Sequence, residues 1–302
     1  FLFLGFANGV MAYSIRDDAT GGDFTLIGTW DSATKICTMS MDLYGLSYGI
    51  NIESDGITLD GNGHTLAGDG NYYSHYPWPY AGIRVYGRSN VIIRNLVIRD
   101  FGFGIHMTGV WNNNLIENNT FSSNLKGMVL QESGFNTVRN NKVTNNVEGI
   151  ECYNCYLSEF NNNFLYQNKW GFYTTFLGND NTYKNNKIES NDIGMFQLLS
   201  SRNAIEGNIV SNNRFAGVAI YDGNFRYGNA GTSGSSGRNK IFQNEIKNNV
   251  YGISFSRTGV GSAPPMNEIY SNNFIGNSQQ ISNSSWGFSN FSLNLDRPVG
   301  GN

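Results

Sequence analysis

Residues 114–124, NLIENNTFSSN, contain the pattern that decides the fold: an asparagine every five residues, with an apolar residue two positions after each of the first two. Complete copies begin at Asn114, Asn136, Asn181, Asn203, Asn239 and Asn267. Two further copies carry one change each, because the copy beginning at Asn90 ends in Asp100 and another begins with Ser158. A pattern repeated this often makes the chain a repeat protein.

A second marker precedes each copy: a glycine followed by an apolar residue, any residue and another apolar residue. It occurs at Gly82, Gly104, Gly127, Gly149, Gly171, Gly194, Gly217 and Gly252, at intervals of 22 or 23 residues as far as Gly217. Each period holds three apolar pieces that are too short for helices and that alternate with polar residues. The sequence therefore predicts an all-β, right-handed parallel β-helix of about nine or ten coils.

The repeated asparagines are predicted to belong to the scaffold and not to a reaction centre. We expect them at the corners between flat faces, where asparagine tolerates a left-handed backbone. At the coil spacing of roughly 4.8 Å, their amides can bond to those of the coils above and below and form ladders.

The composition is that of one globular unit, with 302 residues, a net charge of −3 and 14% charged residues. This balance argues against a nucleic-acid partner, and no segment has the length and apolarity of a membrane helix. We divide the chain into a truncated signal-peptide remnant (1–12, alternatively a capping strand), an N-terminal cap (13–47), the β-helix (48–283) and a C-terminal cap or tail (284–302). Cys152 and Cys155 have no second pair for a zinc site, and Cys152 is interpreted as a buried thiol.

The stretch GITLDGNGHTLAG at residues 56–68, together with the repeats that follow, resembles the right-handed parallel β-helix superfamily with its pectin-lyase-like fold. More narrowly, it is similar to the NosD-like repeat group. The resemblance implies the fold but no single activity, because the superfamily includes polysaccharide lyases, epimerases, glycoside hydrolases, sugar-binding surface proteins and inert scaffolds. No catalytic signature can be transferred, and no cofactor is identified. Calcium is a candidate that no residue pattern indicates.

Alternation within the glycine-marked strands predicts two rows of outward side chains. The first row is Arg84, His106, Val129, Glu151, Tyr173, Phe196, Ala219 and Ser254, and the second is Tyr86, Thr108, Gln131, Tyr153, Thr175, Leu198, Tyr221 and Ser256. The outward row of the first asparagine-repeat strand is predicted as Ile93, Glu117, Arg139, Asn161, Lys184, Glu206, Phe242 and Tyr270. Its alternating charges are typical of a solvated face.

The first two rows give the candidate site. In a polysaccharide lyase or epimerase, Arg84 would neutralise a uronate carboxylate and His106 would abstract the C5 proton. Tyr153 or Tyr86 would protonate the leaving oxygen, and Glu151 would orient the reacting groups. The predicted substrate-binding residues, which supply flat or polar surfaces for sugar rings, are Tyr86, Gln131, Tyr173, Trp78, Tyr221 and Asp222. No metal ligands are predicted.

Three alternatives remain open. Hydrolysis would need paired carboxylates, for which Glu132 and Glu151 are the nearest candidates, and we rank it below elimination. A non-catalytic structural, adhesive or sheath protein is the second reading, with self-association through end coils or loops. Copper delivery is the third, although the sequence has no His/Met/Cys cluster beyond the cysteine pair. The expected partner is a polysaccharide or other glycan, and the expected location is extracellular, cell-surface or periplasmic.

Overall fold

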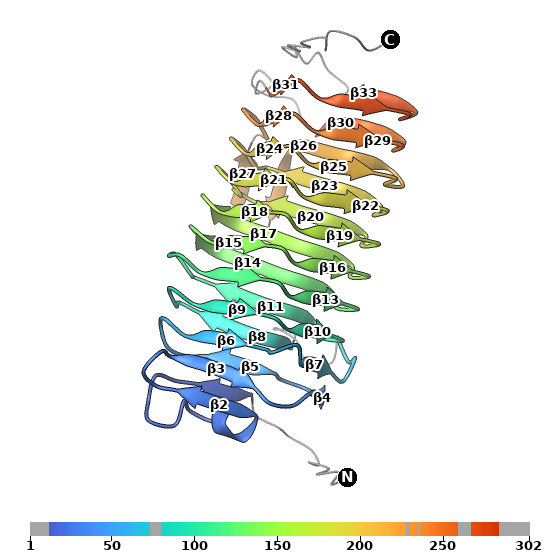
Figure 1. Ribbon diagram of the computed structural model, residues 1–302. Coiled ribbons are helices and arrows are strands. Elements are labelled where there is room, and N and C mark those ends of the chain that lie inside the picture. Colours follow the sequence, from blue (N-terminus) through green and yellow to red (C-terminus); the bar gives the residue numbers. More distant parts are fainter. Residues whose placement is uncertain (1–11, 73–79, 228–229, 235, 259–266, 284–302) are drawn as a thin grey trace.

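Three β-sheets wind around one core, and each turn of the chain adds one strand to each sheet (Figure 1). The computed structural model describes residues 12–72, 80–227, 230–234, 236–258 and 267–283. The sheets have 12, 11 and 10 described strands, and we call them the first, second and third sheet. Within the described residues every strand pairing is parallel except those of β2 with β3 and of β26 with β27.

The first sheet consists of β1 (Tyr13–Ile15), β5 (Ile50–Ile52), β8 (Ala81–Tyr86), β11 (Phe103–Thr108), β14 (Lys126–Gly134), β17 (Glu148–Tyr156), β20 (Trp170–Thr175), β23 (Ile193–Leu198), β26 (Ala216–Tyr227), β27 (Ala230–Gly234), β30 (Tyr251–Thr258) and β33 (Gln279–Asn283). The second consists of β2 (Gly28–Asp31), β3 (Ile36–Met39), β6 (Thr58–Asp60), β9 (Ile92–Arg94), β12 (Leu115–Glu117), β15 (Thr137–Arg139), β18 (Glu159–Asn161), β21 (Thr182–Lys184), β24 (Ala204–Glu206), β28 (Lys240–Phe242) and β31 (Glu268–Tyr270). The third consists of β4 (Leu43–Leu46), β7 (Thr65–Gly68), β10 (Val97–Arg99), β13 (Thr120–Ser122), β16 (Lys142–Thr144), β19 (Phe164–Tyr166), β22 (Lys187–Glu189), β25 (Ile209–Ser211), β29 (Glu245–Lys247) and β32 (Asn273–Ile275).

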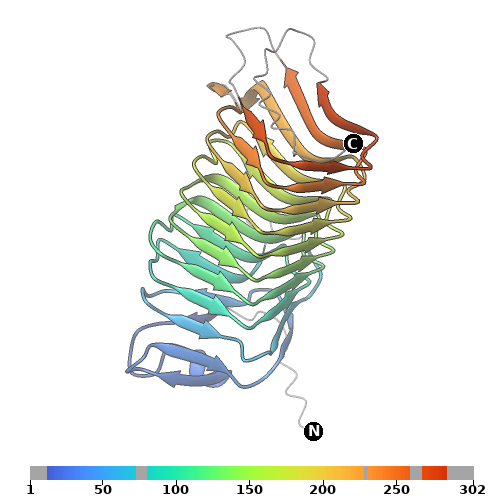
Figure 2. The same cartoon turned by 45° about the horizontal axis from the view of Figure 1, so that its top comes forward.

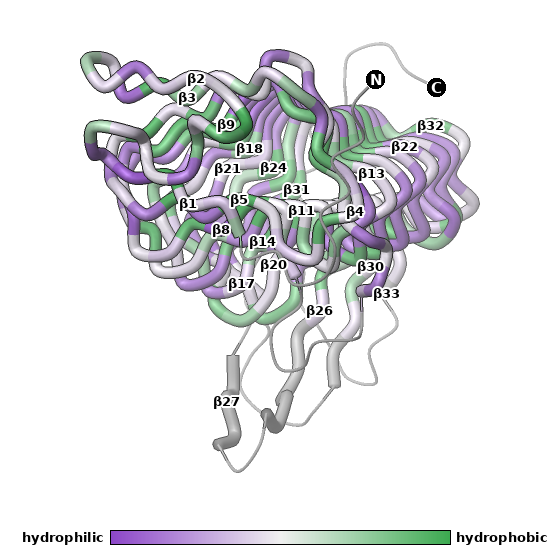
Figure 3. Tube along the Cα trace, turned by 90° about the horizontal axis from the view of Figure 1, so that it is seen from below, coloured by the Kyte–Doolittle hydropathy of each residue, from purple (hydrophilic) through white to green (hydrophobic). Residues whose placement is uncertain are grey.

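The coils stack in register, so that each core position continues from coil to coil (Figure 2). Ile105 pairs with Met128, which pairs with Ile150, and all three are fully buried. Viewed along the axis, the three sheets form separate flanks of one cross-section (Figure 3). The predicted parallel β-helix is confirmed, and the ten strands of the third sheet agree with the expected nine or ten coils.

The N-terminal segment combines cap-like features with the repeat. Strands β1, β3 and β4 each pair in parallel with the next coil. The segment also contains a short 3-10 helix, η1 (Phe24–Leu26), and the antiparallel strand β2, which ends the second sheet. An antiparallel strand at this end covers the edge that an open coil would expose. The segment therefore forms a first coil of the solenoid, and its role as a cap stays a prediction.

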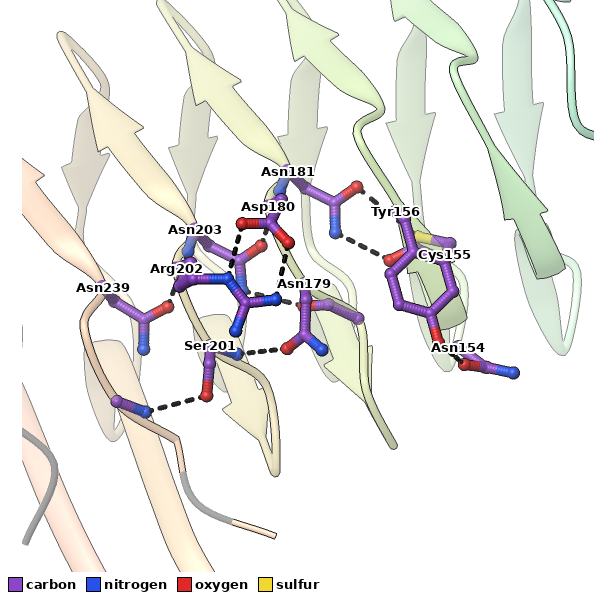
Figure 4. A network of polar contacts seen from close by, with 12 residues as sticks. Asn154, Cys155, Tyr156, Asn179, Asp180, Asn181, Ser201, Arg202, Asn203 and Asn239 are labelled. Carbon is purple, nitrogen blue, oxygen red and sulfur yellow. Dashed lines mark hydrogen bonds and ion pairs between the residues drawn. The ribbon is translucent and has the colours of Figure 1, made fainter.

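Buried asparagines form three ladders along the solenoid, as the repeat predicts. In the second ladder, the Nδ2 atom of Asn141 donates to Oδ1 of Asn163 at 3.1 Å, and Asn119 donates in the same way to Asn141. The first ladder, part of which Figure 4 shows, is Asn114, Asn136, Ser158, Asn181, Asn203, Asn239 and Asn267. The others are Asn119, Asn141, Asn163, Asn186, Asn208, Asn244 and Asn272, and Asn124, Asn146, Asn168, Asn191, Asn213, Asn249 and Asn277.

The expectation of a left-handed backbone was assigned to the wrong asparagines. The ladder asparagines point inward, and the preceding residue has a positive φ wherever the structure describes it, such as Asn118 (56°) and Asn140 (55°). Asn90 and Asn95 occupy this preceding position too, with φ of 57° and 58°. In the coil that begins at Asn90, the ladder positions are occupied by Val91, Leu96 and Phe101. Their backbone N–H groups donate to the side-chain oxygens of Asn114, Asn119 and Asn124, respectively.

This offset of one residue also corrects the predicted outward row of the second sheet. Ile93 is fully buried and pairs with Ile116, whereas Arg94 pairs with Glu117 on the outside. One coil earlier, Asp60 continues this outward row, because it pairs with Arg94. The corrected row is more regularly charged than the predicted one, with an ion pair of 2.9 Å between Arg94 and Asp60.

Cys152 and Cys155 form a disulfide, which corrects the interpretation of Cys152 as a thiol. Both residues are buried, as the inward position of Cys152 predicts. The strand bends between them, because Asn154 has a positive φ of 51°, and the bend brings both side chains inward. Asn181 of the first ladder donates from Nδ2 to the Cys155 carbonyl at 3.0 Å (Figure 4). Cys37 is a buried free thiol, and burial raises its pKa to about 12.

Candidate functional site

The outer face of the first sheet carries the predicted rows in the expected register. His106 lies between Arg84 and Val129 on neighbouring coils, and Glu151 lies between Val129 and Tyr173. Further along each strand, Thr108, Gln131, Tyr153 and Thr175 follow one another in the second row. The predicted site residues on this face therefore share one continuous surface.

A charged cluster of Lys126, Glu148 and Glu151 lies at the centre of this face. The Lys126 Nζ atom is 2.8 Å from Oε2 of Glu148 and 2.7 Å from Oε2 of Glu151. The three side chains are 21%, 13% and 9% exposed, so all are largely withdrawn from water while remaining open to it. Burial raises the pKa of Glu148, with the Glu151 charge adding to the effect and Lys126 opposing it. The two carboxylates raise the pKa of Lys126 against the effect of burial.

The repeated glycine explains why two glutamates three residues apart share one face of β17. Strict alternation would place Glu148 and Glu151 on opposite faces. At the glycine the alternation is interrupted, because a Cβ atom on the equivalent Gly127 would point into the core, 3.0 Å from Val143. At Gly149 it would lie 2.4 Å from the carbonyl oxygen of Gly171. The residue before each glycine therefore faces outward, and the glycine permits the close approach of coils.

His106 is a hydrogen-bonding group within this face. Its Nε2 atom lies 2.8 Å from Oγ1 of Thr108 and 3.3 Å from Oε1 of Gln131, and its ring meets the edge of Phe103. Burial lowers the pKa of His106 to about 4, and the cations Arg84 and Lys126 add to this effect. The bond to Gln131 acts in the opposite direction. The imidazole is therefore neutral at pH 7.

An aromatic platform follows the charged cluster on the next three coils. It consists of Trp170, Tyr173, Phe196 and Tyr221. Neighbouring ring centroids in it are 4.8–6.1 Å apart, and Trp170 and Tyr173 both stack on Phe196. All four side chains are half-buried, so one surface of the group is open to solvent. Burial raises the pKa of Tyr173, and the nearby charges of Glu148 and Glu151 add to the effect.

The platform and the cluster adjoin one another. In the pairing of β17 with β20, Trp170 lies opposite Glu148 and Tyr173 lies opposite Glu151. The face therefore offers flat apolar rings next to hydrogen-bonding and ionisable groups, which is the combination that sugar rings require.

Sequence reasoning missed half of this arrangement. Lys126, Glu148 and Trp170 were not among the predicted outward residues, although each stands directly before a repeated glycine. That position was the available signal. Among the predicted residues, Tyr86 is 72% exposed at the end of the second row, and Tyr153 contacts Phe176 with ring centroids 5.5 Å apart. Trp78 and the side chain of Asp222 lie outside the described residues.

Comparison with known proteins agrees with this architecture. Residues 46–179 match the family model "Right handed beta helix region", and residues 178–294 match the model "Periplasmic copper-binding protein (NosD)". The chain belongs to the right-handed parallel β-helix superfamily. No curated protein matches the sequence.

Solved structures with the same fold share little sequence with this β-helix. The Dettilon tailspike protein is 16% identical with a TM-score of 0.59, over 82% of this chain and 61% of the tailspike chain. A double mutant of the periplasmic alginate epimerase AlgG is 13% identical with a TM-score of 0.55, over 87% and 79% of the two chains. DFA-IIIase from Arthrobacter chlorophenolicus A6 is 12% identical with a TM-score of 0.55, over 77% and 62%. At these identities the likeness concerns the fold alone.

The copper in the second family description does not fit the residues of this β-helix. Residues 178–294 contain no histidine and no cysteine, and of their two methionines Met195 is fully buried in the core and Met266 lies outside the described residues. Among the described residues no group of three His, Cys, Asp or Glu side chains is arranged to hold a metal ion. Copper sites in proteins are built mainly from histidine nitrogen and from cysteine or methionine sulfur.

Proposed function

We propose that the protein binds a linear polysaccharide along the outer face of the first sheet, with the aromatic platform as its stacking surface. The observation that carries the proposal is the platform itself, in which four half-buried rings lie on consecutive coils. Rings on coils spaced at roughly 4.8 Å form an extended surface, which suits a chain ligand. The polar groups of the charged cluster and of the His106 region would bind sugar hydroxyls beside it.

The named functions of similar folds support a carbohydrate ligand. An alginate epimerase and a tailspike share this architecture. Lyase or epimerase chemistry with Arg84, His106 and Tyr153 remains a prediction. Against the assigned base role, a histidine with a pKa of about 4 is poorly matched to proton abstraction near neutral pH. His106 is better suited to hydrogen bonding with the ligand.

An extracellular, cell-surface or periplasmic location is part of the proposal. Disulfides persist in oxidising compartments outside the cytosol, so the Cys152–Cys155 disulfide supports this location. The NosD model is described as periplasmic, which agrees with export. No helix among the described residues is long and apolar enough to cross a membrane.

A glycan array followed by calorimetric titration tests the proposal. Trp170→Ala should weaken binding roughly tenfold or more, because buried aromatic anchors dominate such interfaces. Phe242→Ala is the matched control, because Phe242 stacks on Tyr270 at 5.0 Å on the second sheet, away from the proposed face. Equal affinities of the two variants would refute the platform. Absence of any glycan ligand would favour a structural or adhesive role.

A further inference from the structure

The fold does not require the charged cluster. Lys126 and Glu148 occupy the outward position directly before the repeated glycine. At this position other coils carry Ala81, Phe103, Trp170, Ile193, Ala216 and Tyr251. Withdrawing three charges from water is costly, and replacing a buried ion network with apolar residues is often neutral or stabilising. Lys126, Glu148 and Glu151 therefore call for an explanation beyond stability, and their place beside the platform suggests one.

We propose that Glu148 and Glu151 are a catalytic carboxyl pair that hydrolyses a glycosidic bond of the bound polysaccharide, with Lys126 as a positioning residue. The inference rests on the proposed binding function. Both Oε2 atoms contact one nitrogen, at 2.8 and 2.7 Å, so their separation cannot exceed these two distances together, or 5.5 Å. For these two oxygens the bound excludes the roughly 6.5–9.5 Å spacing of inverting glycosidases and is compatible with the about 5–5.5 Å spacing of glycosidases that act through a covalent intermediate and retain the anomeric configuration.

The electrostatics of the cluster divide the roles between the two carboxyl groups. If both are ionised, one negative charge remains uncompensated by Lys126, whereas protonation of one leaves a neutral ion pair. Burial raises the pKa of Glu148, the Glu151 charge adds to the effect and the Lys126 and Lys169 charges oppose it, so Glu148 is assigned as the acid. Glu151, whose Oε2 accepts the hydrogen bond of the Lys126 ammonium at 2.7 Å, is then assigned as the nucleophile. Opposite pKa demands on two neighbouring carboxyl groups are the usual signature of an acid and a nucleophile.

The reaction then proceeds in two balanced steps. Glu148 gives its proton to the glycosidic oxygen as the bond from that oxygen to the anomeric carbon breaks, and an Oε atom of Glu151 bonds to the anomeric carbon. In the second step Glu148 takes a proton from water, the water oxygen attacks the anomeric carbon, and the bond to Glu151 breaks. One water molecule is consumed, a new reducing end is released, and both carboxyl groups return to their starting states.

The platform fixes where the scissile bond would lie. Trp170 and Tyr173 stand opposite Glu148 and Glu151 on the neighbouring coil. A sugar ring stacked on them places its glycosidic oxygen next to the carboxyl pair. On the coil before Lys126, the Phe103 ring centroid lies 5.9 Å from the Lys126 ammonium, so an aromatic ring borders the cluster there.

The test measures binding and the release of reducing ends together, on the polysaccharides that the glycan array identifies. Wild-type protein should release reducing ends with retained configuration, as followed by NMR. E148Q and E151Q should each lower the rate by about 10²–10⁴-fold while binding persists. K184M and E206Q are matched controls, because this ion pair of 3.0 Å lies on the second sheet, and both should keep full activity. Thermal melts confirm that each variant is folded.

Two further measurements separate the roles without depending on folded variants alone. A 2-deoxy-2-fluoro glycoside of the bound sugar should label wild-type protein at Glu151, as located by mass spectrometry. K126M should move the basic limb of the pH–rate profile to higher pH, because the Lys126 charge lowers the pKa of the acid Glu148 and its removal raises that pKa, and K126R should restore part of the profile.

The outcomes distinguish this inference from the binding function. Binding without reducing ends overturns the catalytic pair and leaves the polysaccharide function intact. An unsaturated uronate product, seen by its ultraviolet absorbance, overturns hydrolysis in favour of elimination. Full activity in E148Q and E151Q overturns the assignment of residues. Absence of binding to every glycan overturns both proposals.

Discussion

Substitution of one ladder asparagine, Asn141→Ala, should destabilise the protein by roughly 2–6 kcal/mol. The Asn141 amide donates to the carbonyl of Ile116 at 2.9 Å and to Asn163 at 3.1 Å, and its oxygen accepts the backbone N–H of Asn119 at 3.0 Å. Alanine leaves the Ile116 carbonyl and the Asn119 N–H buried without these partners. Each orphaned buried group costs about 1–3 kcal/mol, and two such groups give the stated range.

Urea unfolding followed by circular dichroism measures this change, with Asn161→Ala as the matched control. Asn161 is an asparagine of the next coil whose side chain bonds to Glu159 on the solvent-facing side, so its loss should change stability by no more than about 0.5 kcal/mol. Asn141→Asp should cost more than alanine at pH 7, because a carboxylate would face the oxygens that the amide now donates to. A loss below 1 kcal/mol for Asn141→Ala, or equality with Asn161→Ala, would refute the reasoning that the ladder stabilises the solenoid.

Three further predictions follow from single sites. The folded pKa of His106, about 4, lies below the unfolded value near 6.5, so the unfolding free energy should fall by up to about 3 kcal/mol as the pH drops from 6.5 to 4, and His106→Gln should remove that part of the pH dependence. Gly149→Ala, which forces a Cβ to within 2.4 Å of the Gly171 carbonyl oxygen, should lower the midpoint of thermal unfolding far more than Gly134→Ala, where the nearest atom is 3.2 Å away. Unreduced protein in denaturant should react with one equivalent of a thiol reagent, from Cys37, and reduced protein with three; three without reduction would contradict the disulfide.

The sequence alone predicts the solenoid because its determinants are local and repeated. Inward apolar residues and ladder asparagines recur at fixed offsets, and a strand period of two residues assigns each face. The assignment failed in the coil that begins at Asn90, because the corner residue directly precedes the ladder residue and, like it, can be asparagine. Where Val91 replaces the ladder asparagine, the pattern shifts onto the corner residue without any visible break.

The candidate site was half predictable for a related reason. Packing of the core does not constrain the identity of outward residues. Periodicity therefore predicts the face on which they lie but not what they bind or catalyse. Lys126 and Glu148 were missed because strict alternation turns them inward, and the glycine that reverses this direction acts through close approach of backbones in space. The Cys152–Cys155 disulfide was missed likewise, because it depends on the bend at Asn154.

The positions that escape the repeat are also those where function can reside. A solenoid coil fills most of its inward positions with apolar residues and most of its ladder positions with asparagine, so variation is freest on the outside. On the second sheet that freedom produces alternating ion pairs such as Arg139 with Glu117, with one partner on each neighbouring coil. On the first sheet it produces one lysine shared by two glutamates, followed by four rings. Charge pairing accounts for the first pattern, whereas the unequal, largely buried cluster beside an aromatic platform supports the proposal of a ligand face.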